Sequence, residues 1–132
     1  MVTARSDTAA EALRVLVVDD DRRVRASLAC LIGLRVGLTV VGATAADGAV
    51  PALVATTHPD VVVVGLAPCE HEAGLALLRG LHRRWPALVL VATCVQDGLA
   101  QASRAAGADA VITTDSSPEG IGQTLVDLLA IA

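Results

Sequence analysis

The stretch Pro59-Asp60-Val61-Val62-Val63-Val64-Gly65 contains four consecutive valines and no alternation of polar and apolar residues. A strand that is apolar on both faces is typical of a parallel sheet that helices cover on both sides. This stretch therefore predicts a central, buried strand that ends at Gly65. The glycine has no side chain with which to do chemistry at the end of that strand.

The composition indicates one domain with a small aliphatic core. The chain has 132 residues, is 54% hydrophobic, and contains one Trp but no Phe or Tyr. A chain of this length buries roughly two-thirds of its unfolded surface. The apolar runs are far shorter than the ~20 residues of a membrane span, and the start of the chain lacks the pattern of a signal peptide. We therefore expect a cytoplasmic protein without membrane contact.

Charge and cysteine content exclude two further classes of protein. The formal net charge is −4 and most basic residues are scattered, which argues against nucleic-acid binding by this chain. Three cysteines, Cys30, Cys69 and Cys94, form no CxxC pair, so neither a disulfide framework nor a structural zinc site is expected. Reduced thiols are the simplest interpretation.

The rest of the chain alternates predicted strands and helices. Further strands are expected at 13–18, 38–43, 88–93 and 110–113. Helices should begin after Asp21, near Val50, before Leu75, near Gln96, and at Ser117-Pro118, where serine can cap and proline fits the first turn. Residues 1–11 are expected to be a flexible N-terminal segment, and 12–132 to form the domain.

Five strand–helix units predict an open parallel α/β sheet with right-handed crossovers. Ligands of such sheets bind beyond the carboxyl ends of the strands. The informative residues are therefore those that follow each strand, which are 19–21, 65–72, 93–94 and 114–115.

Several strings at these positions resemble one family. They are Val15-Leu16-Val17-Val18-Asp19-Asp20-Asp21, Pro59 to Leu66, Gly107 to Thr114, and Ser116-Ser117-Pro118-Glu119. In this order and spacing they are similar to the receiver domain of two-component response regulators, in the subgroup normally followed by a LuxR-type helix-turn-helix domain. The resemblance implies a flavodoxin-like (βα)5 open parallel sheet, with strand order 2-1-3-4-5 and helices on both faces.

The resemblance also assigns residues to a phosphorylation pocket. It implies that Asp19 and Asp20 correspond to the acidic pair that holds Mg²⁺, and Thr93 to the hydroxyl residue after the fourth strand. Gly65 replaces the aspartate that a histidine kinase phosphorylates, and Thr114 replaces a lysine. Val111 stands at the switch position, where an aromatic residue is frequent, and Pro68 comes one residue earlier than usual.

These replacements remove the means of phosphoryl transfer. The reaction needs a carboxylate nucleophile, a metal and a cation. Asp60 begins the same strand and should lie about 17 Å from Gly65 at ~3.3 Å per residue, while Glu70 and Glu72 suit a helix N-terminus. Loss of a carboxylate together with an ammonium leaves the net charge of the pocket unchanged.

Other candidate sites have plainer interpretations beside the functional ones. Weak Mg²⁺ binding at Asp19 and Asp20 would be incomplete, because hard cations prefer more oxygen ligands, and Asp21 is expected to cap a helix. The loop residues Cys69 and His71 could gather with Cys94 in a redox or metal sensor. Their proximity is more simply incidental. Cys30 is expected in the core, His58 and His82 at the surface or at helix ends, and Trp85 at a helix end.

The leading hypothesis is a phosphorylation-independent pseudo-receiver that acts as a regulatory and dimerisation module of a transcriptional response regulator. It would be no enzyme, would need no cofactor, and would form a homodimer. DNA contact would come only through a C-terminal domain absent from this chain. Alternatives are a redox or metal sensor using Cys69 and Cys94, and a regulatory domain that answers to a small ligand or a protein partner.

Overall fold

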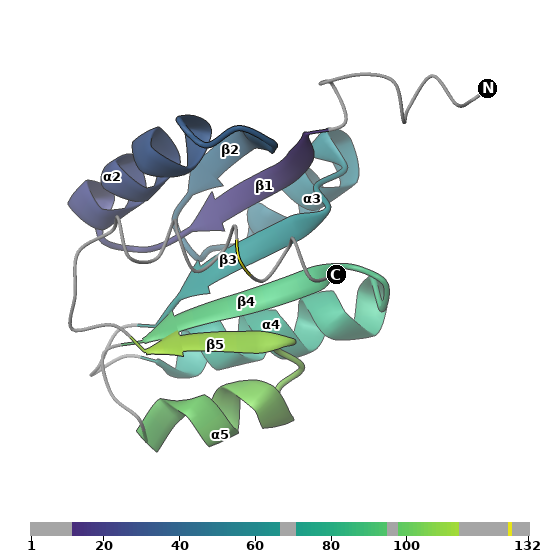
Figure 1. Cartoon of the computed structure of the whole chain (residues 1–132). Coiled ribbons are helices and arrows are strands. Elements are labelled where there is room, and N and C mark those ends of the chain that lie inside the picture. Colours follow the sequence, from purple (N-terminus) through teal and green to yellow (C-terminus); the bar gives the residue numbers. More distant parts are fainter. Residues whose placement is uncertain (1–11, 67–70, 95–97, 114–126, 128–132) are drawn as a thin grey trace.

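The computed structural model describes residues 12–66, 71–94, 98–113 and 127, and shows one parallel sheet with helices on both sides (Figure 1). The five strands lie in the order β2-β1-β3-β4-β5, as predicted. The described elements are β1 (Leu13–Val18), α2 (Arg22–Gly33), β2 (Leu38–Thr44), α3 (Val50–Thr57), β3 (Val61–Gly65), α4 (Glu72–Arg84), β4 (Val89–Cys94), α5 (Gly98–Ala105) and β5 (Ala110–Thr113).

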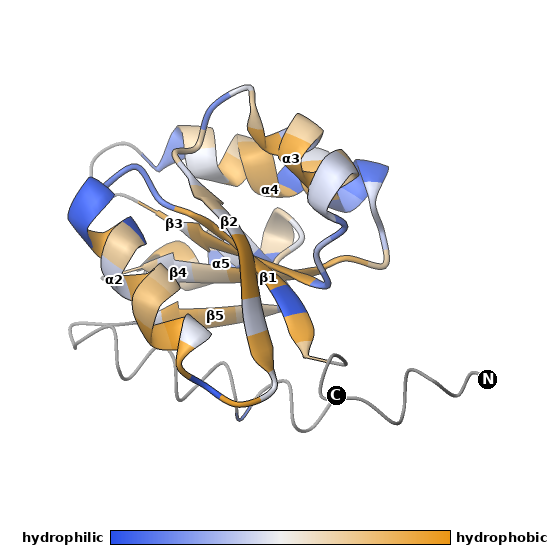
Figure 2. Ribbon diagram, turned by 90° about the horizontal axis from the view of Figure 1, so that it is seen from above, coloured by the Kyte–Doolittle hydropathy of each residue, from blue (hydrophilic) through white to orange (hydrophobic). Residues whose placement is uncertain are grey.

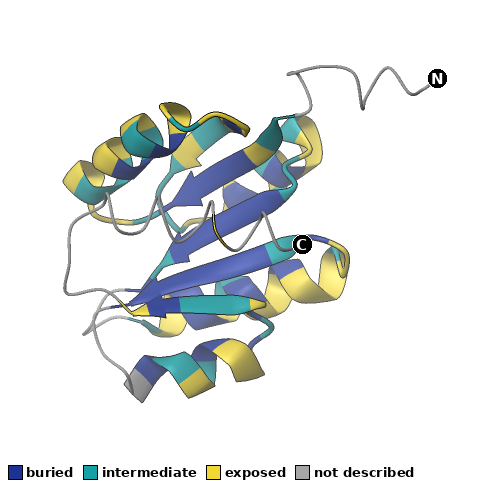
Figure 3. Ribbon diagram, viewed as in Figure 1, coloured by how far each residue is buried: buried dark blue, intermediate teal, exposed yellow. Residues whose placement is uncertain are grey.

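The valine-rich strand β3 is central, as its composition predicts. It pairs in parallel with β1 on one side and with β4 on the other. All four of its valines are fully buried, and most of β1 and β4 on either side is also buried (Figure 3). Branched side chains suit both faces of this sheet because helices cover each of them.

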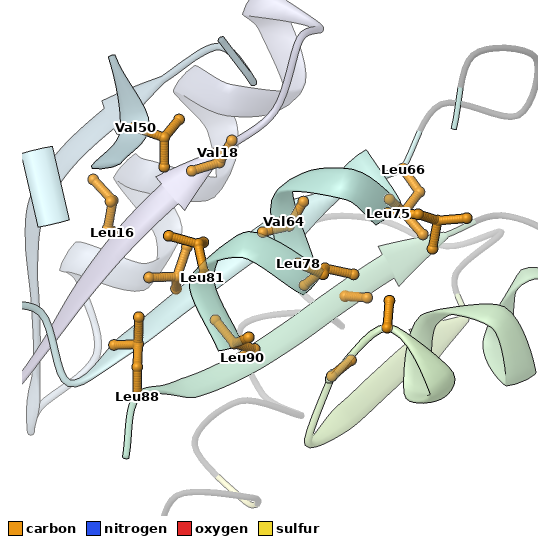
Figure 4. Packing of buried hydrophobic residues seen from close by; sticks show 14 of the residues in the cluster. Leu16, Val18, Val50, Val64, Leu66, Leu75, Leu78, Leu81, Leu88 and Leu90 are labelled. Carbon is orange, nitrogen blue, oxygen red and sulfur yellow. The ribbon is translucent and has the colours of Figure 1, made fainter. Parts of the chain in front are cut away.

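The sheet separates two hydrophobic clusters. On one face, α3, α4 and α5 contribute residues such as Val50, Leu78 and Leu99 to a cluster that includes Leu16 and Leu90 of the sheet; Figure 4 shows this packing. On the other face, α2 contributes Leu28 and Ile32. Figure 2, seen from above, places α3 and α4 on one side of the sheet and α2 on the opposite side.

Hydrogen bonds from side chains satisfy backbone groups at the amino edge of the sheet, where strands begin and α3 ends. Asp60 Oδ2 accepts a hydrogen bond from Arg14 N (2.9 Å), and Asp109 Oδ2 accepts one from Leu90 N (2.8 Å). Each aspartate directly precedes one strand and satisfies an N–H of the neighbouring strand. The Arg14 guanidinium donates to Thr57 O at the end of α3 (2.7 Å). Asp60 therefore has a structural role, and β3 begins after it rather than at Pro59.

A few predicted features differ from the structure or lie outside the described residues. Cys30 is exposed, so its expected place in the core was wrong: Leu28 and Ile32 define the buried side of α2, and Cys30 lies on another side. Residues 1–11 and the helix expected from Ser117 are not described, apart from Asp127. No helix among the described residues is long and apolar enough to cross a membrane.

Candidate functional site

Three chain segments meet at the carboxyl edge of the sheet. Val18, the last residue of β1, is paired with Val64 of β3, so Asp19 emerges beside Gly65. On the other side of β3, Gly65 is paired with Thr93 of β4, and Leu66 N donates to Thr93 O (2.8 Å). The parallel register therefore brings together the strand-end residues that the sequence singles out.

The carboxylate of Asp19 occupies the space beside Gly65. A Cβ atom built on Gly65 would overlap Asp19 Oδ2 and would lie only 2.7 Å from Asp19 Cγ and 3.3 Å from Asp19 Cβ. The other carboxylate oxygen, Oδ1, accepts a hydrogen bond from Asp21 N (2.8 Å), which fixes the orientation of the side chain. The place next to the end of β3 is thus filled by a neighbouring acid, and a side chain at position 65 would require the Asp19 carboxylate to move.

Burial raises the pKa of the Asp19 carboxyl above its ordinary value of 3.8. The negative charges of Asp21 and Asp20 act in the same direction, whereas the hydrogen bond from Asp21 N and the charge of Arg25 oppose the rise. The Arg25 guanidinium contacts Asp19 through the backbone, donating from Nη1 to the carbonyl oxygen (2.8 Å). The carboxyl consequently takes up a proton more readily than a free aspartate does.

The other two acidic residues bond to different backbone groups. Asp21 Oδ1 accepts hydrogen bonds from Arg23 N (2.9 Å) and Val24 N (3.2 Å), which confirms the predicted N-cap of α2. Asp20 Oδ1 accepts one from Ala46 N (2.8 Å) in the segment before α3. The three aspartates thus accept hydrogen bonds from different backbone donors.

This arrangement fits a Mg²⁺ ion poorly. Asp19 turns towards Gly65, Asp20 turns towards Ala46, and Gly65 adds no third carboxylate between them. Within the described ranges, no group of three or more His, Cys, Asp or Glu side chains is placed to hold a metal. Hard cations need more oxygen ligands than these two side chains offer as they are oriented here. Metal binding at Asp19 and Asp20 remains a sequence-based prediction.

Solved structures with the same fold are numerous. A two-component response regulator of the LuxR family from Aurantimonas sp. SI85-9A1 is 30% identical, with a TM-score of 0.75; the similarity covers 89% of this chain and 84% of that one. The chain belongs to the receiver domains of response regulators. No family model matches it, and no curated protein sequence matches it.

Two more distant receiver structures agree in fold. The isolated receiver domain of RcsB from Salmonella enterica serovar Typhimurium, determined with phosphomimetic BeF3⁻, is 16% identical with a TM-score of 0.74, over 89% of this chain and 88% of that one. The response regulator domain of Thermotoga maritima CheB is 23% identical with a TM-score of 0.73, over 92% and 96%. The flavodoxin-like receiver fold predicted from the sequence is confirmed.

Two of the remaining predicted pocket residues of this receiver domain, Thr93 and Val111, lie on β4 and β5. Thr93 is buried and is paired with Gly65 across β3 and β4; its role in a pocket stays a prediction. Val111 is half-buried on β5 opposite Ala92 and packs against the α3–α4–α5 cluster. Thr114 and Pro68 lie outside the described residues.

The cysteines and histidine of the alternative hypothesis fall into different environments. Cys94 is only 2% exposed and belongs to the hydrophobic core at the end of β4. His71 occupies the N-cap position of α4, with Nε2 at 3.8 Å from Glu72 Oε2. Cys69 lies outside the described residues. The burial of Cys94 suits a small apolar side chain in the core better than a redox-active thiol.

Sequence reasoning missed the central feature of the site, which is the position of the Asp19 side chain. It placed Asp19 and Gly65 at the same edge but did not predict which group lies beside the glycine. The available signal was the pairing of β1 with β3, because the residue after Val18 must lie next to the end of β3. The rotamer that fills the space is visible only in three dimensions.

Proposed function

We propose that this receiver domain is a phosphorylation-independent pseudo-receiver, a regulatory and dimerisation module of a transcriptional response regulator. The observation that carries the proposal is the Asp19 carboxylate, which overlaps the position that any side chain at residue 65 would need. A residue without a side chain, covered by a neighbouring carboxylate, has no nucleophile and offers no room for a phosphoryl group.

Asp60 and Glu72 are poor replacements for the missing phosphoacceptor at this edge. Asp60 lies at the opposite end of β3, where its carboxylate accepts the Arg14 N–H. Glu72 lies in the first turn of α4, where its negative charge is favourable, and its side chain is 83% exposed. Thr114 supplies no ammonium group to stabilise a phosphoryl oxygen.

The hydrogen bonds of Asp19 and Asp20 suggest how the loops around the site keep their arrangement without phosphorylation. It holds the start of the β1–α2 loop through Asp21 N, and Asp20 holds the segment before α3 through Ala46 N. The site thus has one internally bonded arrangement. A regulatory signal would have to favour a different conformation by binding it more tightly, because equal affinity for both conformations shifts nothing. We propose homodimerisation as the output, with DNA contact through a separate domain.

The direct test is incubation of the protein with acetyl phosphate and Mg²⁺, followed by intact-protein mass spectrometry. We expect no phosphoryl adduct on this chain, whereas a receiver domain that has an aspartate at this position should show one in parallel. The matched variant Gly65→Asp/Thr114→Lys restores both missing groups and tests whether the loss is confined to them. A stable adduct on the unmodified chain would contradict the proposal.

A further inference from the structure

Two cavities lie side by side on the face of the domain that carries α3 and α4. The first, about 460 Å³, opens between α3 and α4, and the second, about 490 Å³, lies at the amino edge of the sheet by His58 and Leu88. Arg84 and Trp85 line both of them. Together the two cavities form one groove, which we call the α3–α4 groove, with Arg84 and Trp85 at its middle.

The first cavity is lined mainly by apolar residues, and it stays open because the side chains that face each other are short. Pro51 on α3 faces Ala73, Ala76 and Gly80 on α4, while Leu77 and Trp85 supply larger apolar surface. A Cβ atom added to Gly80 would meet open space, which confirms that this part of the groove is unfilled. Its volume lies within the ~300–1,000 Å³ that is typical of sites for small molecules.

Arg84 places a positive charge in this apolar groove. Its guanidinium lies 4.5 Å from the centroid of the Trp85 ring, a cation–π arrangement that holds the group over the indole. In the part of the chain that the structure describes, no carboxylate forms an ion pair with Arg84. The acids that line the groove, Asp47 and Asp60, accept the backbone N–H groups of Ala49 (2.8 Å) and Arg14 (2.9 Å).

We propose that the α3–α4 groove binds a small organic carboxylate with an apolar body, which would make it an input site separate from the pocket at Gly65. The carboxylate would pair with the Arg84 guanidinium, and the apolar part would lie against Leu77 and Trp85 in the first cavity. An arginine held flat on an aromatic ring retains its outer N–H groups for a bidentate contact with a carboxylate. A neutral or cationic molecule of the same shape would leave this charge without a partner.

The chain contains its own reporter for this site. Trp85 is the only tryptophan and the chain has no tyrosine, so the fluorescence of the protein arises in the groove. Titration with octanoate should give a saturable change in Trp85 emission, with matching heat in calorimetry. Octylamine, which has the same tail and the opposite charge, should bind at least about tenfold more weakly.

Variants locate the binding. Arg84→Gln should weaken octanoate binding about tenfold or more, and Gly80→Leu should abolish it by filling the cavity while adding helix propensity to α4. Ala76→Leu provides a second way of filling the groove if the first variant does not fold, as urea denaturation will show. Arg83→Gln is the control, because Arg83 lies in the same helical turn but does not line either cavity.

Equal binding of octanoate and octylamine would overturn the proposal, as would an equal loss of octanoate affinity in Arg83→Gln and Arg84→Gln. Absence of saturable binding to the unmodified chain would also overturn it. Failure of this proposal is distinguishable from failure of the phosphorylation test, because binding is read out by Trp85 fluorescence and phosphorylation by protein mass.

Discussion

Replacement of Gly65 by alanine is the smallest change that tests whether Asp19 fills the site. A methyl group at residue 65 would overlap Asp19 Oδ2 and would lie 2.7 Å from Asp19 Cγ. The backbone of Gly65 itself tolerates alanine, because its φ is not positive. The only obstacle is the neighbouring carboxylate, which must rotate away and release Asp21 N.

The size of the effect follows from what is lost and gained. Release of the 2.8 Å hydrogen bond from Asp21 N to a charged carboxylate costs roughly 1.5–3 kcal/mol. Alanine also restricts the unfolded chain more than glycine does, which raises the free energy of unfolding by about 0.4–1 kcal/mol. Part of the cost is recovered because Asp19 regains hydration when it moves into solvent. We therefore expect Gly65→Ala to lower the free energy of unfolding by about 1 kcal/mol.

The assay is urea denaturation followed by circular dichroism, with Gly48→Ala as the matched control. Gly48 also has a non-positive φ, and a Cβ atom there meets nothing within 4 Å, so the control should be stabilised by about 0.4–1 kcal/mol. A double-mutant cycle with Asp19→Ala should give a coupling of about 1 kcal/mol. If Gly65→Ala were stabilised as much as the control, with no coupling to Asp19, the site would be empty and the reasoning refuted.

Three further predictions address the acidic loop and the end of α5. Because burial holds the Asp19 pKa above 3.8, the ionised carboxyl lowers the free energy of unfolding at neutral pH, and Asp19→Asn should be the more stable protein at pH 7. In urea titrations, the difference in stability between the two proteins should shrink as pH falls through the raised pKa towards 3.8. A difference that stays constant over this pH range would contradict the prediction. Asp21→Ala should lower the unfolding free energy by about 1 kcal/mol through loss of the α2 N-cap, and an unchanged denaturation midpoint would contradict this. Gly107→Ala should lower the free energy of unfolding by about 2 kcal/mol or more, because φ is +117° and the new Cβ would lie 2.7 Å from His82 Cβ. Thermal melts would compare it with Gly80→Ala, which should raise the free energy of unfolding by about 1 kcal/mol. Equal effects of the two substitutions would exclude strain at Gly107.

The strands could be predicted closely because their signals are local. β1 and β5 match the predicted ranges, and β2 extends only one residue further, to Thr44. β4 is shifted by one residue and ends at Cys94. Runs of branched residues bounded by Asp, Gly and Pro fix such elements without knowledge of the partners.

The features that sequence could not supply depend on side-chain direction and on spacing between elements. Cys30 is exposed because the helical phase of Leu28 and Ile32 turns it outwards, a pattern that a stricter count of the helix period would have shown. The rotamer of Asp19 and the groove beside Arg84 have no such local signal. Both arise from contacts between segments far apart in the chain.

The central claim is that the Asp19 carboxylate replaces a residue-65 side chain and leaves no acceptor for a phosphoryl group. The most direct measurement is a high-resolution crystal structure of the protein grown with Mg²⁺ and fluoroberyllate. The account predicts that the Asp19 carboxylate lies against Gly65, with Oδ1 bonded to Asp21 N and no fluoroberyllate at the end of β3. Fluoroberyllate and Mg²⁺ bound there, with Asp19 turned away from Gly65, would contradict it.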